Sequence, residues 1–149
     1  MPTDDDASAR AGNARPFAVH ADELPAEGAG DRTAGELTWT TLISADRTPS
    51  AEMVVGVANF PPGGNLKPHR HAAAEFYFGL AGDGTVSADG REFAIARGTA
   101  VFIPGDTLHG VQAGANGLSF LYGFAVRAFS DIVYHYAGAD VVYRATDAE

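Results

Sequence analysis

Short runs of alternating hydrophobic and polar residues fill most of the chain, and Gly, Pro and Asp separate them about every eight to twelve residues. In "SADGRE", Asp89-Gly90 lies between two such runs and predicts a tight hairpin. We predict strands at 37–44, 52–60, 66–71, 75–80, 84–88, 91–96, 100–103, 109–113, 118–126 and 132–136. Many short antiparallel strands predict an all-β sandwich or small barrel, and a barrel mouth is a common small-molecule site.

The first 35 residues follow a different pattern. They are rich in Ala, Gly, Asp and Glu and have no sustained periodicity. We therefore predict a flexible N-terminal arm over residues 1–35 and a single domain over residues 36–149. In that domain the aromatic residues of strands are expected in the core, namely Trp39, Phe60, Phe102 and Phe124.

Composition and charge narrow the possible partners. The chain has 149 residues, no cysteine and a formal net charge of −9. Without cysteine there is no disulfide framework and no thiolate metal site. The negative charge disfavours nucleic acid as a partner. The N-terminus lacks the apolar segment of a signal peptide, and no run reaches the roughly 18 apolar residues of a membrane span, so a cytoplasmic location without membrane contact is expected.

A cluster of metal-binding residue types stands in the most apolar part of the chain. His69 and His71 are two apart, so they share one face of a strand, and "AAA" is short enough to return the chain to Glu75. His109 begins another predicted strand after a proline turn. The alternative is a set of solvated loop residues, but the flanking residues are apolar and an unpaired buried carboxylate would be costly.

Three imidazoles and one carboxylate suit one divalent transition metal. Zinc usually takes four ligands, whereas iron, manganese, nickel or cobalt would keep positions open for a substrate. We therefore predict His69, His71, Glu75 and His109 as metal ligands, with the metal left open among these five.

The spacing of this cluster resembles the first motif of the cupin superfamily. That motif is Gly, five residues, His-x-His, three or four residues, Glu, six residues, Gly. Its fixed positions are matched by Gly63, His69, His71, Glu75 and Gly82. The resemblance implies the conserved cupin β-barrel, also described as a double-stranded β-helix or jelly-roll sandwich, and usually a homodimer.

The second cupin motif is matched with two departures. Gly98, Pro104 and His109 stand at their expected positions, but Asp106 replaces a glycine and Ala113 replaces an asparagine. These departures touch a turn and a residue that is no ligand, so the implied metal site is retained. Cupins include enzymes, storage proteins and sugar sensors, so the motifs specify fold and metal better than chemistry.

Two further segments resemble the small cupin lyases that cleave dimethylsulfoniopropionate, "AEFYFGLAGDGTV" and "LSFLYGFAVRAFSDIVYHYAG". The resemblance implies that Tyr77 is the catalytic base in a β-elimination on a small organic acid, giving dimethyl sulfide and acrylate. Lining of the barrel is the alternative role for Tyr77. Tyr122 either lines the pocket or packs in the core.

Two other functions stay open at this point. A non-haem iron dioxygenase could use the same four ligands, because they leave room for oxygen and substrate together. A non-catalytic cupin that binds a small ligand is the third possibility.

Overall fold

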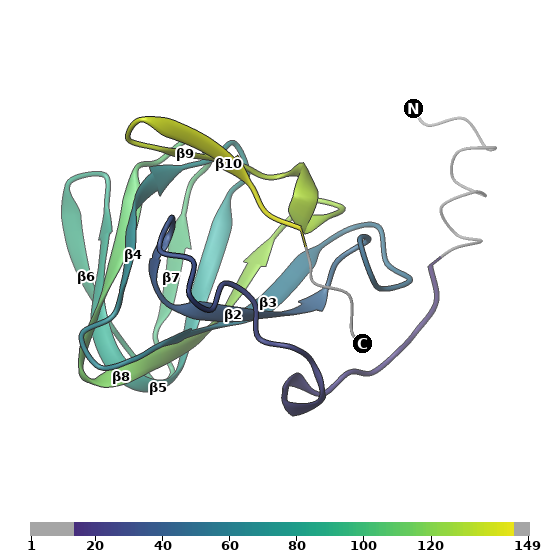
Figure 1. Cartoon of the computed structure of the whole chain (residues 1–149), viewed down its shortest axis with the longest axis horizontal. Coiled ribbons are helices and arrows are strands. Elements are labelled where there is room, and N and C mark those ends of the chain that lie inside the picture. Colours follow the sequence, from purple (N-terminus) through teal and green to yellow (C-terminus); the bar gives the residue numbers. More distant parts are fainter. Residues whose placement is uncertain (1–13, 145–149) are drawn as a thin grey trace.

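Ten strands and two short 3-10 turns make up the structure, a computed structural model that describes residues 14–144 (Figure 1). In chain order they are η1 (Ala21–Glu23), β1 (Gly35–Glu36), β2 (Thr38–Ile43), β3 (Val54–Phe60), β4 (Asn65–Arg70), β5 (Glu75–Ala88), β6 (Arg91–Ala96), β7 (Ala100–Ile103), β8 (His109–Phe124), η2 (Phe129–Asp131), β9 (Val133–Tyr136) and β10 (Ala139–Val142). The predicted all-β fold is confirmed.

All strand pairs are antiparallel, and β8 connects the two halves of the sheet. One path runs β10-β9-β4-β8-β3-β2, while β5 pairs with β6, β7 and β8. Register shifts along β5 and β8 mark bulges, which bend a strand and strengthen its twist. The sheet therefore curls on itself into the barrel of Figure 1.

The prediction divided two strands that are continuous. Segments 75–80 and 84–88 are both part of β5, and 109–113 and 118–126 fall largely within β8. The sequence signals that suggested breaks are the Gly-rich bulges, where β5 skips one residue at each register shift and β8 skips residues 114–117 before pairing resumes. Strands β1 and β10 were not predicted.

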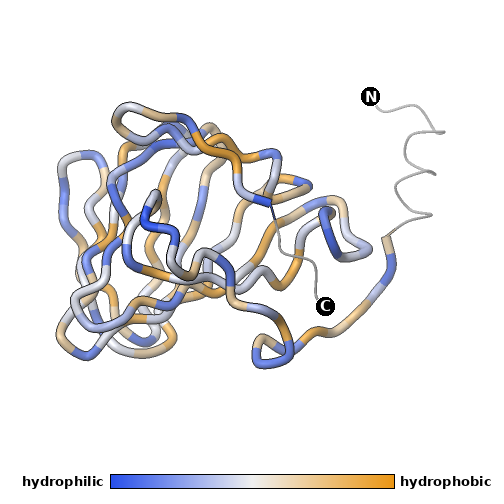
Figure 2. The backbone as a smooth tube through the Cα atoms, viewed as in Figure 1, coloured by the Kyte–Doolittle hydropathy of each residue, from blue (hydrophilic) through white to orange (hydrophobic). Residues whose placement is uncertain are grey.

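Period-two alternation places the core inside the barrel, and hydrophobic and hydrophilic residues alternate along the tube in Figure 2. Trp39, Phe60 and Phe124 are buried as predicted. The prediction for Phe102 was wrong, because its side chain is 70% exposed. Its neighbours Val101 and Ile103 point inward on β7, so Phe102 must point outward.

The turns follow the sequence closely. Asp89 and Gly90 have φ of 53° and 71°, the paired positive values of a type I′ hairpin turn between β5 and β6. Asp106 has φ of 59°, which explains why the cupin motif expects a glycine there. Its backbone N–H donates to the His71 carbonyl over 2.7 Å, so this turn is attached to the segment that carries a predicted ligand.

A segment before β2, residues 27–37, lies against the barrel, and we call it the strap. Glu27 and Trp39 exchange two backbone hydrogen bonds, and β1 pairs with β4. Within the predicted arm of residues 1–35, residues 1–13 lie outside the described residues, and the boundary at residue 35 stays a prediction. The described residues contain no helix that is long and apolar enough to cross a membrane.

Candidate metal centre

Three buried histidines meet inside the barrel. His69 on β4 pairs directly with His109, the first residue of β8, and His71 follows the end of β4. One ring nitrogen from each lies within 4.8 Å of the others, and each side chain is buried. The strands thus bring together His69, His71 and His109, which are placed to hold a metal ion.

Backbone carbonyls orient all three rings. The Nδ1 atoms of His69, His71 and His109 lie 2.8, 2.8 and 2.7 Å from the carbonyl oxygens of Lys67, Ala73 and Thr107 respectively. A carbonyl oxygen only accepts, so each Nδ1 carries the hydrogen and donates it. Each Nε2 is then available as a lone-pair donor, which is the usual arrangement behind a metal-binding histidine.

Glu75 opens β5 and supplies the carboxylate expected beside them. Its Oε1 lies 3.1 Å from Nε2 of His109 and 3.3 Å from Nε2 of His71. With both Nδ1 atoms protonated, these neutral imidazoles would direct lone pairs at a carboxylate oxygen. A cation between them, either a proton or a metal, is needed to make this contact favourable. The donor set therefore fits a divalent transition metal.

Electrostatics agree with a shared cation. Burial, followed by the nearby His109, lowers the pKa of His69 to about 3, so this ring stays neutral. Burial also disfavours the charged form of His71, but the hydrogen bond and negative charge of Glu75 outweigh it and raise the pKa of His71. Burial opposes ionisation of Glu75, yet hydrogen bonds with His109 and His71 leave its pKa lowered.

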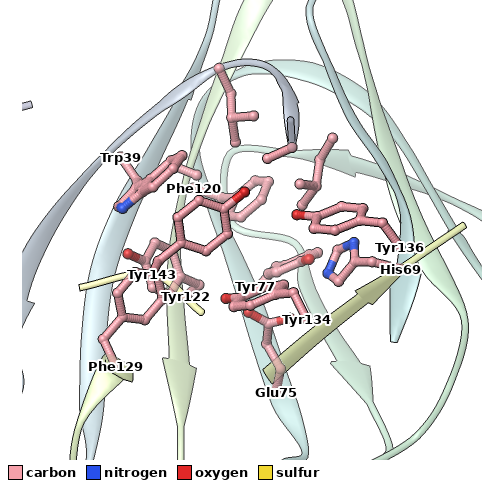
Figure 3. Close-up of a pocket in the computed structure, with 14 residues that line it drawn as sticks. Trp39, His69, Glu75, Tyr77, Phe120, Tyr122, Phe129, Tyr134, Tyr136 and Tyr143 are labelled. Atoms are coloured by element: carbon pink, nitrogen blue, oxygen red, sulfur yellow. The ribbon is translucent and has the colours of Figure 1, made fainter. Parts of the chain in front are cut away.

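An aromatic cavity of about 50 Å³ lies over this cluster (Figure 3). His69 and Glu75 belong to its wall, together with Ala34, Leu37, Trp39, Ala58, Leu66, Tyr77, Phe120, Tyr122, Phe129, Tyr134, Tyr136 and Tyr143. His69 and Glu75 therefore face an aromatic space beside the histidine cluster.

Tyr77 lines this cavity, because it is two residues from Glu75 on β5 and therefore shares its inward face. It is 1% exposed and stacks on Phe120 with ring centroids 4.1 Å apart. Its hydroxyl is buried and has no hydrogen-bond partner within residues 14–144. Burial, then the negative charge of Glu75, raises the pKa of Tyr77 well above its usual value. Tyr122 also lines the cavity, which was one of its two predicted roles.

Three of the tyrosines that line the cavity were missed from the sequence: Tyr134, Tyr136 and Tyr143. Tyr134 and Tyr136 lie on β9 and approach His69 with ring centroids 5.2 and 5.3 Å away. Their two-residue spacing was a usable signal, because it puts both on one face of a strand. Tyr143 follows the unpredicted β10 and contacts Trp39.

The cavity has a second aromatic group away from the histidines. Trp39 lies 5.0 Å from Tyr143 and 6.4 Å from Phe129, and Tyr122 lies 6.5 Å from Phe129, between ring centroids. In Figure 3 these four rings, which we call the aromatic cluster, lie on the side of the cavity opposite His69 and Tyr136. Buried polar atoms without a hydrogen-bond partner within residues 14–144 include Trp39 Nε1 and the hydroxyls of Tyr122 and Tyr143.

Comparison with known proteins identifies the family to which this chain belongs. The model of the cupin domain matches residues 56–121. Over 124 residues, 83% of this chain and 82% of the relative, the chain is 45% identical to the dimethylsulfoniopropionate lyase DddW of Ruegeria pomeroyi. The chain therefore belongs to the cupin superfamily, in the same family as that lyase.

Two solved structures support the fold alone, because they are less than 25% identical. The polyketide cyclase RemF of Streptomyces resistomycificus superposes with a TM-score of 0.68 at 20% identity, over 90% of this chain and 89% of that one. A predicted oxalate decarboxylase of Thermotoga maritima gives 0.64 at 22% identity, over 74% and 99%.

Proposed function

We propose that this protein is a metal-dependent lyase that cleaves dimethylsulfoniopropionate by β-elimination. The observation that carries the proposal is the cavity itself, in which His69 of the buried histidine triad, the carboxylate of Glu75 and Tyr77 face one aromatic space. The 45% identical lyase supports the choice of substrate.

The proposed metal ligands are His69, His71, Glu75 and His109. The histidines are oriented by carbonyls, and Glu75 Oε1 already lies beside two of their Nε2 atoms. A divalent metal held there would supply the positive charge that binds a carboxylate and stabilises negative charge as it develops.

Tyr77 is the proposed base. Its oxygen takes the proton from the carbon next to the carboxylate, the electrons of that C–H bond form the double bond of acrylate, and the bond from the β-carbon to sulfur breaks. Dimethyl sulfide leaves with the electrons of the broken bond. Burial and Glu75 oppose ionisation of the Tyr77 phenol, whereas a divalent cation at the neighbouring histidines favours it.

The walls of the cavity support the same reaction. Aromatic rings bind a sulfonium group through their negative faces, and they exclude bulk water from the developing charge. Tyr134 and Tyr136 pack against His69, so they hold this ligand in place from the cavity side.

An anaerobic assay tests the proposal. Metal-loaded protein should release dimethyl sulfide and acrylate from dimethylsulfoniopropionate in the strict absence of oxygen, because elimination consumes none. A requirement for oxygen would instead favour the dioxygenase reaction. Absence of sulfide release at every metal loading would remove this substrate and leave the metal site to be tested separately.

We also propose that the protein is a homodimer. The outer face of β5 and β7 carries four exposed apolar side chains, Phe76, Phe78, Leu80 and Phe102. Neighbouring exposed apolar side chains are typical of an interface, and a second copy packed on this face would remove them from water. Light scattering should give twice the chain mass, and Phe102→Glu should give the monomer.

A further inference from the structure

The strap places a carboxylate inside the molecule, at Glu27. Its side chain is 4% exposed. Glu27 Oε2 accepts hydrogen bonds from the Thr41 hydroxyl over 2.7 Å and from the Thr41 backbone N–H over 3.1 Å. Two backbone hydrogen bonds with Trp39 fix the main chain on either side. The position of this carboxylate is therefore set by β2 and not by solvent.

The same carboxylate lies beside the aromatic cluster. Trp39, its backbone partner, is a member of the cluster, and so is Tyr122. Thr41 pairs with Gly56, which pairs with Tyr122 on the next strand. The Tyr122 phenol extends over Gly56 toward β2, since a Cβ added at Gly56 would overlap the phenol oxygen. After burial, the charge of Glu27 is the next cause of the raised pKa of Tyr122.

The cavity is therefore electrically asymmetric. At one end, the negative charge of Glu75 faces histidines that are built to hold a cation. At the other end, Glu27 lies beside Trp39 and close enough to Tyr122 to act on its phenol, and both of these cluster residues line the cavity. Aromatic faces attract a cation, and a buried carboxylate behind them adds to that attraction because the low dielectric weakens it little.

We propose that Glu27 is a specificity-determining residue, which selects substrates that carry a permanent positive charge at the end opposite their carboxylate. The preferred class is a short zwitterion with a carboxylate at the metal end and a sulfonium or quaternary ammonium group in the aromatic cluster. This inference rests on the proposed function for the use of the metal end. It adds the residue that distinguishes a cationic substrate from an uncharged one of the same shape.

Two ligands of equal shape and different charge test the inference. 3-(Trimethylammonio)propionate and 4,4-dimethylpentanoate differ only in the charged nitrogen and the carbon that replaces it. Calorimetric titration of the metal-loaded protein should show tighter binding of the ammonium compound. Glu27→Gln keeps the shape and an oxygen acceptor for Thr41, and it should reduce this preference roughly tenfold while leaving the affinity for 4,4-dimethylpentanoate unchanged.

The control is Glu36→Gln, which removes the same charge from an exposed position on the strap, where Glu36 pairs with Arg32. It should leave the preference intact, and Glu27→Asp should retain most of it because the charge remains. Equal weakening of both ligands in Glu27→Gln would show a structural role and overturn the inference. So would equal affinity of the wild type for the two ligands, whatever the stability of the variant. Because binding is measured without turnover, failure of the lyase reaction is recognised separately from failure of this inference.

Discussion

At the scale of single residues, the alternation of side chains along β5 puts the functional groups of Tyr77 and Glu75 on the same face of the strand. Both point inward on β5, with Phe76 between them pointing outward. The carboxylate meets the histidines, and the phenol two residues further on faces the same cavity. A proposed metal ligand, Glu75, and the proposed base, Tyr77, therefore lie on one strand. A substitution of either side chain can leave the position of the other unchanged.

The first prediction concerns the proposed base. Tyr77→Phe should lower the rate of dimethyl sulfide release by roughly 10²–10⁴-fold, the usual contribution of a positioned base. Metal content should be unchanged, because Tyr77 is not one of the proposed ligands and the ring that packs on Phe120 is kept. Parallel measurement of kcat and metal content checks both. Full activity in Tyr77→Phe would move the base to another residue.

The second prediction compares two histidines. His71→Ala should abolish stoichiometric metal binding, because a buried ligand beside Glu75 is lost. His135→Ala is the matched control, since His135 is exposed and bonds Asp140. It should keep about one metal per chain, measured by elemental analysis. Equal metal content in the two variants would contradict the site.

At the scale of elements, the strap and the β9–β10 hairpin both border the cavity, the strap through Ala34 and Leu37 and the hairpin side through Tyr134, Tyr136 and Tyr143. A volume of about 50 Å³ admits a few water molecules, so a substrate requires one of these elements to move. The hairpin is joined to β4 through two residue pairs, His69 with Tyr136 and Arg70 with His135. The strap is held by backbone and side-chain bonds at both ends.

The third prediction is that the hairpin admits the substrate. The chain has no cysteine, so Arg70→Cys/His135→Cys would introduce the only disulfide, across paired exposed positions. The oxidised variant should release dimethyl sulfide at least about tenfold more slowly, and reduction should restore the rate.

Ser87→Cys/Glu92→Cys joins β5 to β6 in the same way, away from the cavity, and serves as the control. This variant should have the same activity when oxidised and when reduced. If the disulfide between β4 and β9 also left the rate unchanged, the route of entry would lie at the strap.

At the scale of the whole molecule, proton and metal compete for one buried cluster. His71 protonates before His69, because Glu75 raises the pKa of His71 despite burial, whereas burial lowers the pKa of His69 to about 3. A raised pKa means that protonation begins at a higher pH than for an ordinary histidine, whose value is about 6.5.

The fourth prediction follows from the direction of that shift. As the pH falls through the raised pKa of His71, protonation should displace the metal, so affinity should be full at pH 8 and weaken progressively toward pH 5. Competition with a chelator at a series of pH values measures this change. A flat metal affinity from pH 8 to pH 4 would contradict proton competition at the site.

Several features of the fold and of the candidate site could be predicted from the sequence alone. Period-two alternation and Gly/Pro turns predicted an all-β sandwich or small barrel. Residues two apart on a strand share a face, which grouped His69 with His71, and the resemblance to the cupin motifs supported the addition of Glu75 and His109 to the predicted metal site. The Asp89-Gly90 turn followed from its local preference for positive φ. The alternation, the pairing of His69 with His71 and the turn are local features, so the sequence alone could indicate them.

Tertiary structure decided the rest. Phe102 is exposed because the other face of β7 is the buried one, and this choice depends on how β7 packs in the barrel. Tyr136 lies beside His69 only because β9 pairs with β4. The burial of Glu27 depends on the strap meeting β2, and the region predicted as an arm carries no periodicity that signals this contact. The wall of the cavity comes from segments far apart in the chain, so its composition could not be derived from the spacing of any one segment.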